Sequence, residues 1–269
     1  GLAGCSGSKT SEPAGSDAGS AKASSKKAVE LQVFAANSLE KALPEVQELY
    51  TEQTGTTFAD TQFKASGDLV EQMRAGAAVD VLITASKGTM DDAEAAELVD
   101  ADTREDMFVN DLVIIRAEGS DTKVEAIADV ANLDGKIAIG DAKTVPAGKY
   151  ANQALASVGL YTGTEGDDGE YAPEIADKVA LADKVGTAAA YVSTGDCVAG
   201  FVYSSDIFRY DGIEEAFVCP EDSHKPIVYP GAVADGSEHA DEAKAFIDFC
   251  LSNKKAQKIW AKYGFELSA

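Results

Sequence analysis

Four short stretches of small and hydroxyl-bearing residues stand directly before predicted helices, and together they have the chemistry of an anion site. The first residues of a helix carry N–H groups without intrahelical partners, together with about half a positive charge. Several such helix starts directed at one point would bind an anion without any Arg or Lys. The stretches are residues 35–39, 63–67, 145–148 and 183–186.

Two of these stretches contain a serine, Ser38 or Ser66, directly before an amphipathic run. A serine in this place would equally serve as an N-cap, a role that stabilises a helix by about 1 kcal/mol. From the residues alone, both the capping role and a role in binding an anion stay open.

Short apolar runs alternate with helical patterns from residue 29 onward, which predicts an α/β fold with mostly parallel sheets. Gly55, Gly76 and Gly159 stand where helices should end, and Pro44 should weaken or bend the helix that contains it. The predicted strands are 31–35, 57–63, 80–84, 110–115, 136–140 and 200–203. The predicted helices are 39–54, 68–75, 87–95, 149–158, 185–193, 241–251 and 254–263.

The chain is strongly acidic, with 23 Lys and Arg residues against 46 Asp and Glu residues and a formal net charge of −23. This charge repels phosphate groups, so neither nucleic acid nor an anionic membrane surface is an expected partner. A small anion is also repelled at long range. An anion site here must therefore act locally, through oriented dipoles in a screened cleft.

The first residues carry a targeting signal rather than folded structure. Residues 2–5 resemble a bacterial lipobox, in which Cys5 becomes the lipidated first residue of the mature protein. Residues 6–27 are rich in Ser, Ala, Gly and Lys and cannot bury enough apolar surface to fold. We therefore expect residues 1–27 to comprise a signal-peptide remnant, the lipobox and a flexible tether, which anchors an extracytoplasmic protein.

The other three cysteines show no spacing typical of a zinc site, and no metal is expected to bind them. Cys197 precedes the apolar run 198–203, and Cys219 follows the run 216–218. A Cys197–Cys219 disulfide would be geometrically possible if these two strands lay antiparallel and adjacent, since export permits disulfides. Cys250 lies in a helical pattern and is expected to be a buried free thiol.

Catalytic and nucleotide-binding motifs are absent. No GxGxxG follows a strand, and no GxxxxGK[ST] or GxSxG occurs. His224 and His239 lie in polar turns and have no partner motif. A serine hydrolase that used Ser38 or Ser66 is therefore disfavoured, and we expect a binding protein that needs no cofactor.

Several motifs occur in the order found in the family of periplasmic molybdate-binding proteins of bacterial ABC importers, and the chain resembles this family over about residues 29–267. The matching stretches are residues 33–39, 75–80, 140–148, 202–206, 220–224 and 262–265. The resemblance implies capture of molybdate or tungstate, as an oxyanion, and its delivery to an ABC transporter permease. A monomer is expected, attached to the membrane only through its lipid.

The resemblance also implies a two-lobed type II periplasmic-binding-protein fold whose lobes close on one oxyanion. Lobe 1 would combine residues 28–109 with 229–269, and lobe 2 would span 110–228. Five positions match the family's ligand contacts. Hydroxyls and N–H groups would come from Ser38 and Ser66, backbone N–H groups from Ala147 and Val185, and a phenol from Tyr203. Asn37, Gly67, Asp68 and Lys184 depart from the family's usual residues beside these contacts.

A site of this kind offers donors only, which suits a fully deprotonated tetrahedral dianion. Hydrogen phosphate carries a proton that needs an acceptor, so such a site penalises it. Sulfate has the same donor requirement and differs in size, and a receptor for sulfate or another small oxyanion is the alternative function. Molybdate and tungstate are too similar in size for the sequence to separate them.

Overall fold

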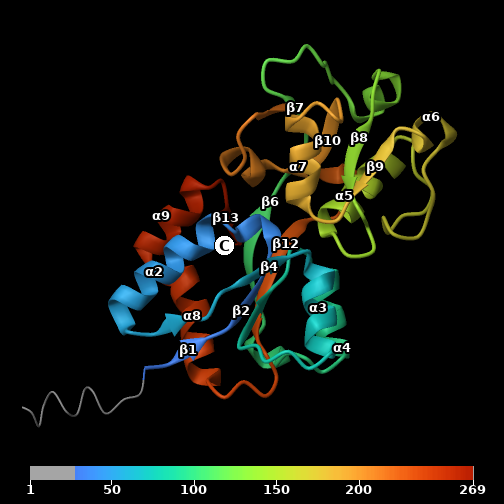
Figure 1. Ribbon diagram of the computed structural model, residues 1–269. Coiled ribbons are helices and arrows are strands. Elements are labelled where there is room, and N and C mark those ends of the chain that lie inside the picture. The colour runs from blue at the N-terminus through green and yellow to red at the C-terminus, as the bar shows by residue number, and fades with distance from the viewer. Residues whose placement is uncertain (1–27, 269) are drawn as a thin grey trace, which may run out of the picture.

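Two β-sheets, each covered by helices, form the two lobes of the computed structural model, which describes residues 28–268 (Figure 1). Lobe 1 is the six-stranded sheet with its helices, and lobe 2 is the five-stranded sheet with its helices. The α/β class and the two-lobed architecture are as the sequence predicts. Cys5 and the tether lie outside the described residues.

Lobe 1 has a mixed sheet between two layers of helices. Helices α2, α8 and α9 pack together on one side of the sheet, and α3 and α4 lie on the other (Figure 1). The strand order is β13 (Glu266–Leu267), β6 (Glu105–Asn110), β12 (Ile227–Val233), β5 (Val81–Ile83), β2 (Val33–Ala36) and β4 (Gln62–Lys64). The helices are α2 (Ala42–Thr54), α3 (Ser66–Arg74), α4 (Lys87–Ala95), α8 (Ala240–Ser252) and α9 (Lys254–Lys262), with the 3₁₀ helices η1 (Asn37–Leu39) and η2 (Ala101–Thr103). A separate pair joins β1 (Glu30–Leu31) to β3 (Thr57–Phe58).

Lobe 2 is built on strands from the middle of the chain. Its sheet order is β11 (Ile213–Val218), β7 (Leu112–Ala117), β10 (Ala199–Tyr203), β8 (Ile137–Gly140) and β9 (Val179–Ala182). Its helices are α5 (Pro146–Ala156), α6 (Pro173–Ala176) and α7 (Val185–Ser193), with the 3₁₀ helices η3 (Ile127–Asn132), η4 (Ser204–Phe208) and η5 (Glu221–Ser223). Helices α5 and α7 both pack against β8 and β10.

The prediction of mostly parallel sheets is wrong, because both sheets are mixed. In lobe 1 the pairs of β2 with β4 and β5 are parallel, whereas β12 is antiparallel to both β5 and β6. The chain leaves lobe 1 after β6 and re-enters along β12, so these two crossing strands must run in opposite directions. The predicted boundaries at 109/110 and 228/229 stay a prediction, and the strand membership of the two sheets agrees with them to within two residues.

The first predicted helix begins later than expected. Residues 37–39 form the separate 3₁₀ helix η1, and α2 starts only at Ala42. Pro44 is therefore the third residue of α2 and lies in its first turn, where no N–H is needed for an intrahelical bond. For this reason Pro44 does not weaken the helix as predicted.

The Cys197–Cys219 disulfide that the sequence left possible does not form, because both cysteines are free and buried. Strand β7 lies between β10 and β11 and is antiparallel to each of them. Strands β10 and β11 are therefore parallel to each other and are not neighbours. The start of β10, where Cys197 lies, and the end of β11, where Cys219 lies, are consequently at opposite ends of the sheet. Cys250 is free and buried, as predicted.

Candidate anion-binding site

All five residues predicted to touch the anion line one small cavity between the lobes, with about 220 Å³ of empty space. Lobe 1 contributes Ser38 from η1 and Ser66 from the start of α3. Lobe 2 contributes Ala147, Val185 and Tyr203. The remaining lining residues are Ala36, Asn37, Lys64, Ala65, Ala85, Val145 and Pro146. Both lobes thus contribute residues to one small space.

Three of the five residues lie at the first positions of α-helices. Ser66 is the first residue of α3, Val185 is the first of α7, and Ala147 follows Pro146 at the start of α5. The N–H groups at these positions have no intrahelical acceptor. Pro146 suits its place because it lacks an N–H and its fixed φ angle favours helix entry. The local sequence thus brings three backbone donors without intrahelical partners to one cavity.

Ser66 and Ser38 are not N-caps. The N-cap residues of α3 and η1 are Ala65 and Ala36, and neither helix has a side-chain capping bond. Instead, the fully buried Ser66 hydroxyl accepts a hydrogen bond from the Ala85 N–H at 2.9 Å. Because that bond uses a lone pair of Oγ, the hydroxyl proton stays available for donation.

Tyr203 ends β10 and is the most informative side chain in the cavity. Its Oη is buried and has no hydrogen-bond partner within residues 28–268. A buried polar group without a partner costs about 1–3 kcal/mol, so such a group calls for an explanation. Burial raises the pKa of Tyr203 well above its ordinary value of 10.0, which keeps the phenol protonated and able to donate.

Tyr229 forms a hydrogen bond with the Ser38 hydroxyl, a contact that the sequence did not indicate. Its Oη lies 2.7 Å from Ser38 Oγ and accepts a weaker bond from Asn110 Nδ2 at 3.4 Å. Burial raises the Tyr229 pKa, so this phenol also stays protonated. If Tyr229 donates to Ser38 Oγ, the Ser38 hydroxyl proton is available to a bound anion. Tyr229 lies within an apolar strand, where nothing in the sequence separates it from a core aromatic.

Charged side chains are scarce around the cavity. Lys64, in β4, is the one lining residue with a charged side chain. The sequence predicted an anion site without any Arg or Lys, so in this respect the lining differs from the prediction. Of the departures noted in the sequence, Asn37 lines the cavity, whereas Gly67, Asp68 and Lys184 do not. Burial raises the Asp68 pKa above its ordinary value, and nearby Lys64 opposes this rise. No carboxylate therefore faces an anion among the lining residues.

The part of the chain that the structure describes contains no histidine-dependent catalytic site at the cavity, no metal cluster and no membrane-spanning helix. Neither His224 nor His239 lines the cavity. No cluster of three or more His, Cys, Asp or Glu residues within 28–268 could hold a metal ion. None of the helices described is long and apolar enough to cross a membrane.

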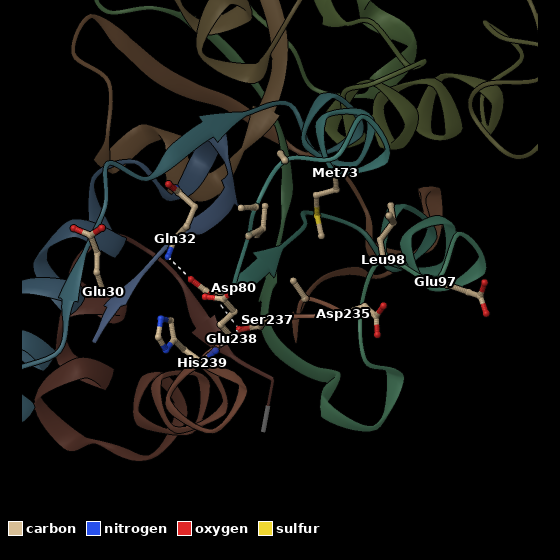
Figure 2. A pocket seen from close by; sticks show the side chains of 15 residues that line it. Glu30, Gln32, Met73, Asp80, Glu97, Leu98, Asp235, Ser237, Glu238 and His239 are labelled. Atoms are coloured by element: carbon tan, nitrogen blue, oxygen red, sulfur yellow. Dashed lines mark hydrogen bonds between the residues drawn. The ribbon is translucent and has the colours of Figure 1, made fainter. Parts of the chain in front are cut away.

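A larger hollow lies on lobe 1, away from the interface between the lobes (Figure 2). Its central carboxylate, Asp80, accepts hydrogen bonds from the Gln32 N–H and the Ser237 hydroxyl, both at 2.7 Å. These bonds join the residue before β2, the residue before β5 and the turn before α8. Asp80 therefore has a structural role, and the hollow offers no comparable set of free donors.

The model of the bacterial extracellular solute-binding protein family matches residues 31–266. The molybdate-binding protein ModA of Escherichia coli is 33% identical over 242 residues, which cover 88% of this chain and 89% of that protein. ModA of Haemophilus influenzae is 31% identical over 237 residues, or 87% and 88% of the two chains.

The solved structure of the Azotobacter vinelandii periplasmic molybdate-binding protein has the same fold, with a TM-score of 0.74. It is 20% identical, and the match covers 89% of this chain and all of that one. The family match spans both lobes and every residue that lines the cavity. The chain therefore belongs to the bacterial extracellular solute-binding protein family.

Proposed function

We propose that this protein captures molybdate or tungstate between its lobes and delivers the oxyanion to the permease of an ABC importer. The family match and the ModA relatives support this function. Ser38, Ser66, Ala147, Val185 and Tyr203 are the proposed ligand contacts. We assign the protein no enzymatic activity, because the buried Ser66 hydroxyl accepts from a backbone N–H and neither His224 nor His239 lines the cavity.

One observation carries the proposal, namely the buried Tyr203 hydroxyl without a partner. It lines a cavity that also receives the unpaired N–H groups of three helix starts. An anion that accepts hydrogen bonds on all sides would satisfy these donors together. Charge-assisted hydrogen bonds of this kind are about twice as strong as neutral ones.

The donor set selects against a protonated ligand. No carboxylate lines the cavity to accept the proton of hydrogen phosphate, so that anion would bury an unpaired group. A fully deprotonated dianion such as molybdate, tungstate or sulfate avoids this cost. Among these three, the size of the closed cavity must discriminate.

We further propose that the protein works outside the cytoplasm as a monomer, with its membrane anchor at Cys5. The lipobox-like residues 2–5 support the anchor. Mass spectrometry of the N-terminal peptide from membrane-extracted protein tests it. A diacylglycerol-modified cysteine is the expected result, and an unmodified N-terminal peptide that retains a free Cys5 would contradict it.

Elemental analysis of protein purified from its native source, without added ligand, tests the proposed function. We expect molybdenum or tungsten to co-purify in an amount comparable with that of the protein. If the native protein instead carried a sulfur oxyanion and neither metal, the alternative of a sulfate receptor would replace the proposal.

A further inference from the structure

A group of polar contacts joins the two lobes beside the anion cavity, and Arg209 lies at its centre. Arg209 follows η4 in lobe 2, and its side chain is only 2% exposed. Nε and Nη2 donate to Asp206 Oδ1 at 3.1 and 2.9 Å, within the same lobe. Nη1 reaches lobe 1, where it lies 2.8 Å from the Asn37 carbonyl oxygen and 2.7 Å from Glu40 Oε1.

Asn37 and Tyr210 extend these contacts across the same interface. The Asn37 side-chain oxygen accepts from the Gly186 N–H at 3.2 Å and from the Tyr210 hydroxyl at 3.5 Å. Its side-chain amide donates to Glu40 Oε2 at 3.0 Å. The Tyr210 hydroxyl also lies 3.4 Å from Glu40 Oε1. We call Asn37, Glu40, Gly186, Arg209 and Tyr210 the clasp.

The clasp adjoins the proposed ligand contacts along the chain on both sides of the interface. Asn37 precedes Ser38, and Gly186 follows Val185. The hydrogen bond from Gly186 to Asn37 thus ties the start of α7 in lobe 2 to η1 in lobe 1. Any separation of the lobes that moves Val185 away from Ser38 must therefore also stretch the hydrogen bond between Gly186 and Asn37.

The clasp also has a charge arrangement that makes it strong. Asp206 is fully buried, and Glu40 is 33% exposed. A planar guanidinium is suited to such a place, because its donors reach several oxygens at once and it gives up hydration readily. Asp206 holds the guanidinium in position on lobe 2, so the group does not have to be ordered when the lobes meet.

We propose that Arg209 is a positioning residue, which clasps Glu40 and the Asn37 carbonyl of lobe 1 and thereby sets the rate at which the bound oxyanion is released. This inference rests on the proposed function. Release requires opening of the lobes, so contacts that hold the lobes together lower the open population. Their loss should raise the dissociation rate and leave the association rate almost unchanged.

Replacement of Glu40 by alanine tests the clasp, with Glu45→Ala as the matched control. Glu45 is 35% exposed, but it pairs with Lys262 inside lobe 1. Protein loaded with radiolabelled molybdate is chased with excess unlabelled molybdate, and the retained label is followed. We expect Glu40→Ala to release the label about 5- to 30-fold faster than the wild type, since one charge-assisted contact on a partly exposed carboxylate is lost. Glu45→Ala should match the wild type.

A second variant, Arg209→Lys, tests the same contacts from lobe 2. Arg209→Lys preserves the charge beside Asp206 but cannot reach three acceptors at once, so it should also release the label faster. Equal release rates for wild type, Glu40→Ala and Arg209→Lys would overturn the clasp and leave the proposed function intact.

If the wild type bound no molybdate, the proposed function would fail instead. Small-angle scattering would then test the clasp separately, through the radius of gyration of the ligand-free proteins. Glu40→Ala should have a larger radius of gyration than both the wild type and Glu45→Ala, and equal radii would overturn the clasp.

Discussion

At the scale of single residues, the important feature of the cavity is that its hydroxyl groups still have a proton to donate. Tyr203 has a buried hydroxyl without a partner, whereas Ser66 has one bond from Ala85 and a proton to spare. Motif order was enough to nominate both from the sequence. Tyr229 and Arg209 could not be nominated, because their roles depend on partners 191 and 172 residues away along the chain.

Replacement of Tyr203 by phenylalanine should weaken molybdate binding by about 1.5–3 kcal/mol, or about 10- to 150-fold, because one hydrogen bond to a charged group is lost. The phenyl ring keeps its packing against Tyr150 and Tyr229, whose ring centres lie 6.4 and 5.7 Å away. Calorimetric titration measures the change. Tyr191→Phe, on α7 outside the cavity, serves as the control, and equal affinities of both variants would contradict the role of Tyr203.

The pH dependence of binding follows from the same phenol. Ionisation would remove a donor and place a negative charge against the dianion, so binding should be lost as Tyr203 deprotonates. Because burial raises its pKa above 10.0, this loss should begin only above pH 10. We expect the dissociation constant for molybdate to stay constant from pH 7 to pH 9. A tyrosine-dependent loss of affinity within that interval, absent in Tyr203→Phe, would show that the phenol is not buried as described.

At the scale of elements, helix starts bring the donors together, and close contact between the lobes closes the cavity. The sequence predicted α4 and α7 at their observed bounds, because apolar periodicity and flanking residues agree there. It did not resolve β6 as a strand or η1 as a separate turn. β6 pairs only with β12 and β13, from the far end of the chain, and such pairing leaves little local signal.

Gly67 shows how tightly two elements meet. It is the second residue of α3, and its N–H donates to the Thr144 carbonyl of lobe 2 at 3.0 Å. A Cβ on Gly67 would lie 2.8 Å from Thr144 Cα, so Gly67→Ala should keep the lobes from closing fully. Overpacking of this kind costs about 1–3 kcal/mol, which predicts molybdate binding about 5- to 150-fold weaker, measured by calorimetry.

Gly88→Ala is the matched control for this variant. Gly88 is also the second residue of a nine-residue helix, α4, and the nearest atom to its Cβ would be Lys149 Nζ at 3.8 Å. Both substitutions should leave the melting temperature of the ligand-free protein unchanged or slightly raised, because alanine favours a helix over glycine. Unaltered binding in Gly67→Ala would mean that the lobes do not meet at this point when the ligand is bound.

At the scale of the whole molecule, a chain of net charge −23 is proposed to bind a dianion. The composition indicates only that such a site must be local and screened. The structure has a cavity between the two lobes, and no carboxylate lines it. The fold class was predictable from alternating elements. The mixed sheets and the separation of Cys197 from Cys219 were not predictable, because both depend on the order in which the strands pair. The sequence pattern indicates where strands occur but not which strands are neighbours.

The central claim is that neutral, donor-only contacts select a fully deprotonated tetrahedral dianion. Isothermal titration of ligand-free protein with molybdate, tungstate, sulfate and phosphate tests this claim most directly. We predict tight binding of molybdate and tungstate, weaker binding of sulfate and no measurable binding of phosphate, whose proton would find no carboxylate to accept it. Binding of phosphate as tight as that of molybdate, or no binding of either molybdate or tungstate, would contradict the claim.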